Sequence, residues 1–222
     1  MNLSDKTFNL LKNFSSINQS ILFKQGNTLR TMSVMKNILA EADIEEDIPQ
    51  DFAIYDLVRF LNGISLFEEP ELDFTNDSHL TIRDGKSKRT KYFFADPSVI
   101  VAPPEKSIEL PSEDVTFTLD SNNLIQLLKA SAVYGLPDLS AVGEAGVVKL
   151  VIRDKKNDTS DDFSIIVGET DKVFSFNFKI ENIKILPGTY KVDISEKLLS
   201  RFVNESHNLT YYIALEPDST FG

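Results

Sequence analysis

Apolar and polar positions recur with the period of an α-helix in four stretches of this 222-residue chain. The first stretch, residues 5–18, carries a stripe formed by Leu10, Leu11, Phe14 and Ile17. At about 100° per residue, the opposite face carries only polar side chains: Asn9, Lys12, Asn13 and Ser16. This pattern predicts an amphipathic helix with one buried and one exposed face.

Three further stretches predict helices. Residues 56–67 form a stripe of Leu57, Phe60, Leu61, Ile64 and Phe67, with Arg59 and Asn62 behind it. Residues 121–136 predict a helix whose N-cap is Asp120 or Ser121. Its apolar face carries Leu124, Leu127 and Leu128, and the opposite face carries Asn122, Gln126 and Lys129. Residues 179–186 predict a short helix that Pro187-Gly188 closes.

Strand-like runs fill the space between these helices. In the first half they cover residues 20–24, 28–34, 38–44, 51–55, 79–84 and 90–95. In the second half they cover residues 147–154, 162–169, 174–178, 190–195, 200–206 and 209–216. Each half therefore reads helix, strands, helix, strands, which predicts an α+β fold of antiparallel sheets with helices on one face.

The two halves are separated by a segment without helical periodicity. Residues 96–114 hold four of the nine prolines and predict an extended connector. We therefore expect an N-terminal domain at residues 1–96, a connector at 97–114 and a C-terminal domain at 115–222 that repeats the first domain's design.

Composition changes this picture in two ways. The chain has no cysteine, no apolar stretch typical of a signal peptide and no run that could span a membrane, so we expect a cytosolic protein. Its net charge of -11 argues, taken alone, against nucleic-acid binding. Residues 5–18, 57–67, 121–136 and 179–186 nevertheless each carry a net charge of +1, which favours a mildly basic surface that contacts phosphates without reading bases.

No catalytic machinery is visible. The phosphate-binding, dinucleotide-binding, nucleophile-elbow and zinc-protease motifs are absent from the sequence. We expect the two histidines, His79 and His207, to be exposed turn residues, and residues 154–162 to form a solvated hairpin loop. The acidic pairs Glu45-Glu46 and Glu68-Glu69 are expected to be surface charge. These features predict a protein without enzymatic activity, metal or cofactor.

Several ordered segments carry a family resemblance: "FAIYDL", "ADPSVIVAP", the "LLK" helix, "KILPGTYK" and "YYIALEPDST". Together they span the chain, which resembles the sliding clamps of T4-like bacteriophages, the processivity factors of phage DNA polymerases. The resemblance implies a DNA-clamp fold that assembles as a homotrimeric ring around double-stranded DNA. It implies that the ring lumen presents five cations to DNA: Lys6, Lys12, Arg59, Lys129 and Lys184.

The mechanism implied by the resemblance is topological: a closed ring tethers the phage DNA polymerase and raises its effective concentration at the primer terminus. Further implied partners are an ATP-driven clamp loader and late-transcription factors, in the cytoplasm of the infected bacterial host. Partner peptides would enter an outer pocket lined by Val99, Ile100, Val101, Pro103, Tyr212 and Leu215.

Two alternatives stay open at this stage. One is a monomeric scaffold that binds peptides through the connector without encircling DNA, which the oligomeric state would distinguish. The other is a small phage nuclease with clustered carboxylates that hold a metal ion, for which the sequence offers no clear ligand set.

Overall fold

The structure is a computed structural model that describes residues 1–85, 87–157 and 159–222. The chain forms two compact units. Unit 1 comprises residues 1–105 with 207–209, and unit 2 comprises residues 106–206 with 210–222. The division between residues 105 and 106 falls inside the predicted connector. None of the described helices is long and apolar enough to cross a membrane.

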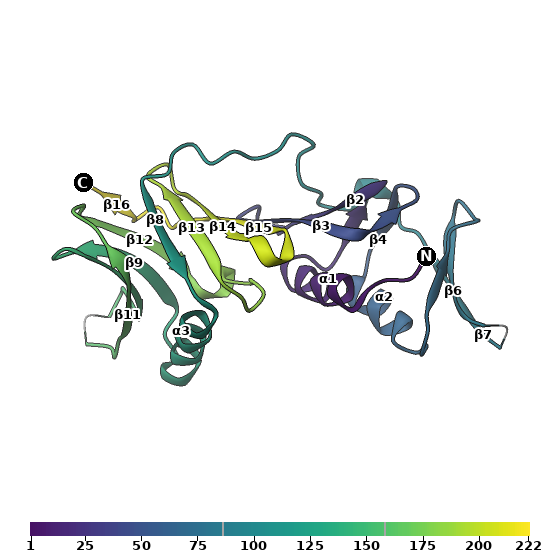
Figure 1. Cartoon of the computed structure of the whole chain (residues 1–222), viewed down its shortest axis with the longest axis horizontal. Coiled ribbons are helices and arrows are strands. Elements are labelled where there is room, and N and C mark those ends of the chain that lie inside the picture. Colours follow the sequence, from purple (N-terminus) through teal and green to yellow (C-terminus); the bar gives the residue numbers. More distant parts are fainter. Residues whose placement is uncertain (86, 158) are drawn as a thin grey trace. The chain divides into compact units, whose positions relative to one another are not determined.

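In the part of unit 1 that the structure describes, there are two α-helices and seven antiparallel strands. In chain order they are α1 (Asp5–Ile17), β1 (Ile21–Phe23), β2 (Gly26–Met32), β3 (Ile38–Ile48), β4 (Phe52–Ile54), α2 (Leu57–Ile64), β5 (Glu71–Asp73), β6 (His79–Asp84) and β7 (Lys88–Phe93). A 3-10 turn, η1 (Pro97–Val99), follows. Strand β1 pairs with β4, β2 with β3, and β5, β6 and β7 form a three-stranded sheet in that order. Figure 1 shows α1 and α2 side by side against these strands.

The core of unit 1 forms where the helices' apolar stripes meet the strands. Leu11 and Phe14 of α1 are fully buried, and α1 contacts α2, β2 and β3. Aromatic rings join the remaining elements: Phe23 stacks on Phe52 with centroids 4.4 Å apart, and Tyr92 of β7 packs edge-on against Phe60 of α2. Each fully buried aliphatic or aromatic side chain contributes about 1.5–3 kcal/mol relative to exposure, so these contacts fix which helix faces turn inwards.

Within the described residues, unit 2 contains one α-helix, two sheets and two 3-10 turns, although His207 at the end of η3 and Leu209 at the start of β15 belong to unit 1. Its elements are β8 (Val115–Leu119), α3 (Ser121–Tyr134), β9 (Asp138–Glu144), β10 (Val147–Arg153), β11 (Phe163–Glu169), β12 (Phe174–Lys179), η2 (Ile180–Asn182), β13 (Tyr190–Ser195), β14 (Leu199–Asn204), η3 (Glu205–His207), β15 (Leu209–Ala214) and β16 (Thr220–Phe221). One sheet has the order β11-β10-β9-β12-β16, and in the other β8, β13, β14 and β15 are consecutive neighbours. Helix α3 contacts β10 and β11.

The two units repeat one design. The series α1-β1-β2-β3-β4-α2-β5-β6-β7 in unit 1 corresponds to α3-β9-β10-β11-β12-η2-β13-β14-β15 in unit 2. The pairings correspond as well, because β1 pairs with β4 as β9 pairs with β12, and β2 with β3 as β10 with β11. The prediction of two similar α+β domains with antiparallel sheets is confirmed.

The predicted helix at residues 179–186 is wrong. Only Ile180–Asn182 turn, as the 3-10 element η2, and the chain then continues without a helix. Ile183 and Ile185 are buried while Lys184 between them is exposed, which is the alternation of an extended segment. Two β-branched isoleucines two residues apart favour that conformation over a helix.

The two histidines differ from each other. The prediction that His79 is an exposed turn residue is wrong, because it begins β6, is 9% exposed and packs its ring 5.2 Å from that of Phe93. His207 does lie in a short turn, η3, and is half-buried.

The predicted loop at 154–162 joins the hairpin of β10 and β11. Lys156, Asn157 and Thr159 of this loop are exposed, and Asp158 lies outside the described residues.

Alanine substitutions at two glycines should change the free energy of unfolding in opposite directions. A Cβ at Gly143 in β9 would meet the Phe174 ring at 2.3 Å and the Lys172 carbonyl oxygen at 2.7 Å, whereas a Cβ at Gly63 in α2 meets nothing within 4 Å. We expect Gly143→Ala to lower the free energy of unfolding by about 1–3 kcal/mol through overpacking. Gly63→Ala should raise it by about 0.5–1 kcal/mol because alanine loses less backbone entropy in a helix. Urea unfolding measures both, and equal effects of the two substitutions would contradict the packing.

Candidate nucleic-acid interface

Helix α1 presents two lysines to solvent. Its N-cap is Ser4, whose hydroxyl accepts a hydrogen bond from the Thr7 backbone N–H at 3.2 Å. Because the apolar stripe is buried, Lys6 and Lys12 are exposed on the remaining surface. The Lys12 ammonium lies 4.7 Å from the centroid of the Phe8 ring, a cation–π contact that holds the side chain along the helix. The predicted exposed position of both lysines agrees with the structure.

Helix α2 presents one cation. Its N-cap is Asp56, whose carboxylate accepts the Arg59 backbone N–H at 2.9 Å. The Tyr92 hydroxyl donates to the Asp56 carbonyl oxygen at 3.1 Å, which ties the start of α2 to β7. Burial raises the pKa of Tyr92, so this hydroxyl keeps its proton. Arg59 is exposed, and α1 and α2 contact each other, so unit 1 brings Lys6, Lys12 and Arg59 onto one pair of helices.

Helix α3 presents a mixed surface. Asp120 is its N-cap and accepts the Asn123 N–H at 2.8 Å, while Gly135 ends it in the left-handed region with φ of 66°. Lys129 is exposed as predicted. The same helix also exposes Ile125, Val133 and Tyr134, so its outer side is less polar than the sequence pattern suggests.

Lys184 is exposed but does not lie on a helix. It follows η2, between the buried Ile183 and Ile185. Two hydrogen bonds of Leu186 hold this segment in unit 2. The Tyr190 hydroxyl donates to the Leu186 carbonyl oxygen at 2.6 Å, and the Leu186 N–H donates to the Tyr211 hydroxyl at 3.2 Å. All five predicted DNA-facing cations are therefore exposed, four of them on α-helices.

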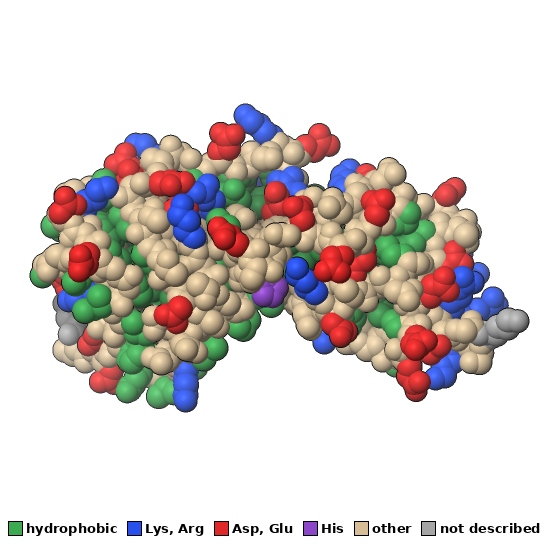
Figure 2. All heavy atoms as spheres, in the orientation of Figure 1, with side chains coloured by type: hydrophobic (Ala, Val, Ile, Leu, Met, Phe, Trp, Pro, Cys, Tyr) green, Lys and Arg blue, Asp and Glu red, His purple; other side chains and the backbone are tan. Residues whose placement is uncertain are grey.

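The surface around these cations has the chemistry of weak phosphate contact. Exposed lysine and arginine attract phosphate oxygens at long range, and they carry no information about base sequence. Figure 2 shows acidic and basic side chains interspersed over each unit, so positive charge is local to particular elements. Within the described residues, no group of three or more His, Cys, Asp or Glu side chains could hold a metal ion.

The connector is anchored on unit 1 at its start. The Asn18 amide donates to the Val101 carbonyl oxygen at 3.2 Å, and Arg30 donates to the Pro104 carbonyl oxygen at 2.8 Å. Of the predicted pocket residues here, Val99 is 55% exposed, Ile100 is buried, and Val101 and Pro103 are half-buried. In unit 2, Tyr212 is half-buried and Leu215 is buried. The pocket formed by these six residues stays a prediction.

The connector is anchored on unit 2 at its end by a carboxylate that is fully buried, Asp193. Asp193 accepts hydrogen bonds from Arg201 at 2.7 Å and from the Thr116 hydroxyl at 2.8 Å, and Lys191 lies 3.3 Å away. Arg201 also pairs with Glu113 of the connector. Burial alone would raise the pKa of Asp193, but the hydrogen bonds from Arg201, Thr116 and Lys191 outweigh burial and hold it below the usual value.

Sequence reasoning missed two features near the candidate interface. Strand β7 exposes a row of cations, Lys88, Arg89 and Lys91, at the free edge of its sheet. The spacing of "KRTKYF" could have indicated an edge strand, since lysines commonly protect such edges. The second missed feature is strand β9. Its buried residues include the polar Asp138 and Ser140, so the sequence lacks the alternation of apolar and polar residues that predicts a strand.

Comparison with known proteins adds two matches to protein families. Residues 3–102 match the family model for "DNA polymerase processivity factor". Residues 116–217 match the family model for "gp45 sliding clamp, C terminal". The two matches together cover most of the chain.

Curated relatives match over nearly the whole length. The chain is 36% identical to the sliding clamp of Vibrio phage KVP40 over 223 residues, covering 97% of this chain and 99% of the relative. It is 36% identical to the sliding clamp of Escherichia phage RB69 and 34% identical to that of Enterobacteria phage T4, each over 230 residues and 99% of both chains.

Solved structures share the fold at much lower identity. The Proliferating Cellular Nuclear Antigen of Entamoeba histolytica aligns with a TM-score of 0.70 at 16% identity, over 95% of this chain and 94% of that one. The A. fulgidus PCNA structure, with the C-terminal region of FEN-1 bound, aligns with a TM-score of 0.71 at 14% identity and 98% coverage of both chains. At this level of identity the likeness shows the fold alone.

The buried Asp193–Arg201 pair generates a pH-dependent prediction. A carboxylate whose folded pKa is depressed stabilises the fold above its unfolded pKa of about 3.9, and this contribution disappears as pH falls through the folded value. We expect Arg201→Gln to cost about 2 kcal/mol at pH 7, since Lys191 and Thr116 remain as partners of Asp193. In urea unfolding the difference from wild type should shrink below pH 4. A difference that stays constant from pH 7 to pH 3 would contradict the assignment, and Lys197→Gln at an exposed pair is the control.

Proposed function

The chain belongs to the phage sliding-clamp family of DNA polymerase processivity factors, and we propose that it works as a homotrimeric ring closed around duplex DNA. The observation that carries this proposal is the exposure of Lys6, Lys12, Arg59 and Lys129 on helices whose other faces are buried. In a chain of net charge -11, these helices give DNA a weakly positive surface to approach.

The proposed mechanism is topological. A closed ring leaves DNA only at an end or by opening, so it keeps the tethered polymerase at a high effective concentration near the primer terminus. Individual exposed cation–phosphate contacts are weak and independent of sequence, which lets the ring slide. We infer that the protein carries out no chemical step itself, so that opening depends on an ATP-driven loader made of other proteins.

The trimer needs two complementary edges, one from each unit, so that neighbouring copies join head to tail. Strand β7 is one edge strand of the β5-β6-β7 sheet in unit 1, and β11 is one edge strand of the β11-β10-β9-β12-β16 sheet in unit 2. A contact between two different surfaces is heterologous, and heterologous contacts that close generate rings. We propose that β7 of one copy pairs with β11 of the next.

Charge and apolar exposure support this choice of edges. Strand β7 exposes the three cations Lys88, Arg89 and Lys91, whereas the exposed acids Asp161 and Asp162 precede β11 and the exposed Glu169 ends it. Apolar side chains are exposed on and near each edge. Phe93 lies on β7, and Tyr55 and Val58 flank Asp56, whose carbonyl oxygen accepts the Tyr92 hydroxyl of β7. Ile166 lies on β11, and Ile125 and Val133 lie on α3, which contacts β11. Figure 2 shows hydrophobic side chains gathered over α3 and β11. Joining the edges would bury these side chains and bring opposite charges together.

The remaining partners are proposed from the family. The ring would serve the phage DNA polymerase, the clamp loader and late-transcription factors in the cytoplasm of the infected bacterial host. Val99, Ile100, Val101, Pro103, Tyr212 and Leu215 remain the proposed lining of the partner-peptide pocket. The hydrogen bonds that hold the Val101 and Pro104 carbonyl groups support a pre-formed wall on the unit 1 side.

Charge reversal on the helices tests the DNA-facing surface. We expect Lys12→Glu with Lys129→Glu to shorten the products of processive synthesis. The slope of DNA affinity against salt should fall by about one for each phosphate that the variant no longer neutralises. Both lysines are exposed, so thermal unfolding should stay close to wild type. Lys106→Glu with Lys156→Glu makes the same charge change at exposed positions off the helices and is the control. Equal effects of the two double variants would refute the assignment of the lumen.

Sedimentation equilibrium tests the proposed joint. The wild type should form a species of about 75 kDa, three times the chain mass of 25.0 kDa. Ile166 is 61% exposed on β11, so Ile166→Lys would place a cation against the basic edge of β7 and should shift the species towards 25 kDa. Val34→Lys, at a 65% exposed position in unit 1 away from β7, is the matched control. A wild type that stays monomeric at all concentrations would contradict the ring itself.

A further inference from the structure

Unit 1 contains a cavity of about 490 Å³ that none of the roles above uses. It lies between the start of the chain with α1 and the end of α2 with the loop that follows; we call it the N-terminal cavity. It is lined by Asn2, Leu3, Asp5, Phe8, Ile64, Ser65, Phe67, Glu68, Glu69 and Pro70. Its volume falls within the range of about 300–1,000 Å³ that is usual for ligand pockets.

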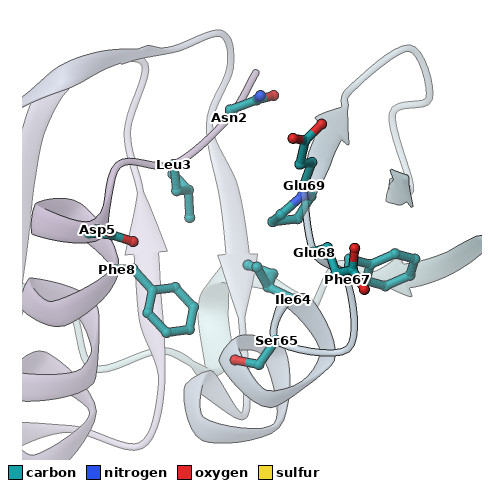
Figure 3. A pocket seen from close by; sticks show the side chains of 10 residues that line it. Asn2, Leu3, Asp5, Phe8, Ile64, Ser65, Phe67, Glu68 and Glu69 are labelled. Atoms are coloured by element: carbon teal, nitrogen blue, oxygen red, sulfur yellow. The ribbon is translucent and has the colours of Figure 1, made fainter. Parts of the chain in front are cut away.

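The lining of this cavity is mixed, with five apolar and five polar or charged residues. Figure 3 shows Leu3, Phe8 and Ile64 projecting towards a common space from the N-terminal segment, α1 and α2. Phe67 and Pro70 contribute further apolar surface from the loop after α2. Leu66, the residue between Ser65 and Phe67, is 75% exposed beside the cavity. A bound apolar side chain would therefore contact Leu3, Phe8 and Ile64 on one part of the lining, with polar groups on the rest.

The walls are held in place by hydrogen bonds. Met1 and Leu72 exchange two backbone hydrogen bonds, at 2.9 and 2.7 Å, which attaches the start of the chain to β5. Glu46 of β3 accepts hydrogen bonds from the Ser4 N–H and, at 2.6 Å, from the Thr7 hydroxyl. Burial alone would raise the pKa of Glu46, but these hydrogen bonds keep it lowered and the group charged. The sequence-based expectation that Glu46 is simple surface charge is therefore wrong.

The opposite wall is fixed as well. The Ser65 hydroxyl and N–H both donate to the Leu61 carbonyl oxygen at 3.0 Å, and the Phe67 N–H donates to the Ile64 carbonyl oxygen at 3.1 Å. Both walls thus exist before anything binds, and little ordering cost would fall on the protein.

The rim of the cavity is acidic, and its charges are unpaired. Asp5, Glu68 and Glu69 line it, no Lys or Arg lines it, and none of the three carboxylates has an ion-pair partner among the described residues. The end of α2 adds the negative end of a helix dipole.

A second cavity in unit 1 provides the comparison. It is also lined by three acids, Asp47, Glu71 and Asp73. There, however, Arg83 pairs with Glu71 at 2.9 Å and with Asp73 at 3.7 Å, and it lines the cavity itself. The second cavity therefore supplies its own cation, whereas the N-terminal cavity leaves three carboxylates beside the apolar side chains of Leu3, Phe8 and Ile64 for a cation from elsewhere.

We propose that the N-terminal cavity binds a partner-protein segment in which a large apolar side chain is flanked by lysine or arginine. The apolar side chain would fill the space between Leu3, Phe8 and Ile64, and the flanking cations would face Asp5, Glu68 and Glu69. DNA does not fit this site, because its phosphates would be repelled by the rim. The site is thus a second docking surface on unit 1, away from the connector. It adjoins the basic face of α1, because the lining residue Phe8 also contacts the Lys12 ammonium.

A fluorescent synthetic peptide with a Leu-Phe pair flanked on each side by two lysines is the probe, with fluorescence anisotropy at low ionic strength as the readout. A matched peptide with glutamates in place of the lysines tests the charge requirement. We expect the basic peptide to bind the full-length protein and the acidic peptide not to bind. Failure of the basic peptide to bind, or equal binding of both peptides, would overturn the proposal.

Variants separate this site from general attraction to an acidic protein. Glu68→Gln with Glu69→Gln should weaken binding of the basic peptide roughly five-fold through two exposed charge contacts. Glu45→Gln with Asp77→Asn removes the same charge from exposed positions of unit 1 outside the cavity and should change nothing. Ser65→Phe should obstruct the cavity and abolish binding. Equal weakening by both double variants, or unchanged binding to the Ser65→Phe protein once its thermal unfolding is shown to match wild type, would refute the site.

These measurements need no DNA and no polymerase. The proposal therefore stands or falls independently of the processivity and sedimentation experiments above, and a clamp that is fully active in replication could still fail to bind the peptide.

Discussion

Burial of one apolar face of each helix against the strands of its own unit governs the other features of this structure. Leu11 and Phe14 of α1, Leu57 and Phe60 of α2, and Leu124 and Leu127 of α3 are almost fully buried. Each such side chain contributes about 1.5–3 kcal/mol, whereas an exposed lysine's ion pair is worth about 0–1 kcal/mol. The core therefore decides how each helix is rotated, and the cations are carried outwards as a consequence.

The distribution of charge follows from the same hierarchy. Two buried carboxylates form ion pairs: Asp138 with the Lys179 ammonium at 2.5 Å, and Asp193 with the Arg201 guanidinium at 2.7 Å. These pairs support strands and the connector, and they leave the exposed helix cations available for phosphates. In the proposed ring, sliding requires many weak contacts, and exposed single lysines would provide them without a cost to the fold. The net charge of -11 is therefore compatible with DNA binding, because what matters is the local surface.

Repetition of one design in the two units does not make the units identical. In unit 1 the second helical position is a true helix, α2, which contacts α1; in unit 2 the corresponding position is the three-residue turn η2. Lys184 is consequently presented by an extended segment, and the exposed side of α3 carries Ile125 and Val133 as well as Lys129. Unit 2 thus offers fewer helix-borne cations, and α3 exposes more large apolar side chains than α1 or α2, which favours a role of α3 in contacts between copies.

The amino-acid sequence was sufficient for the elements whose signals are local. Asp120 and the Leu124–Leu127 spacing predicted α3 and its cap, and strand alternation predicted β10 through β13, because periodicity and capping depend on neighbouring residues only. The tertiary fold was needed for segments whose partners lie far away in the chain. Strand β9 escaped notice because Asp138 and Ser140 are buried against Lys179 and Asn177, and residues 183–186 became extended because both isoleucines could reach the core. The edges of β7 and β11 and the acidic rim of the N-terminal cavity also depend on the tertiary fold. Whether a strand edge or a carboxylate has a partner is decided by which distant segments the fold brings next to it, and the local sequence does not show this.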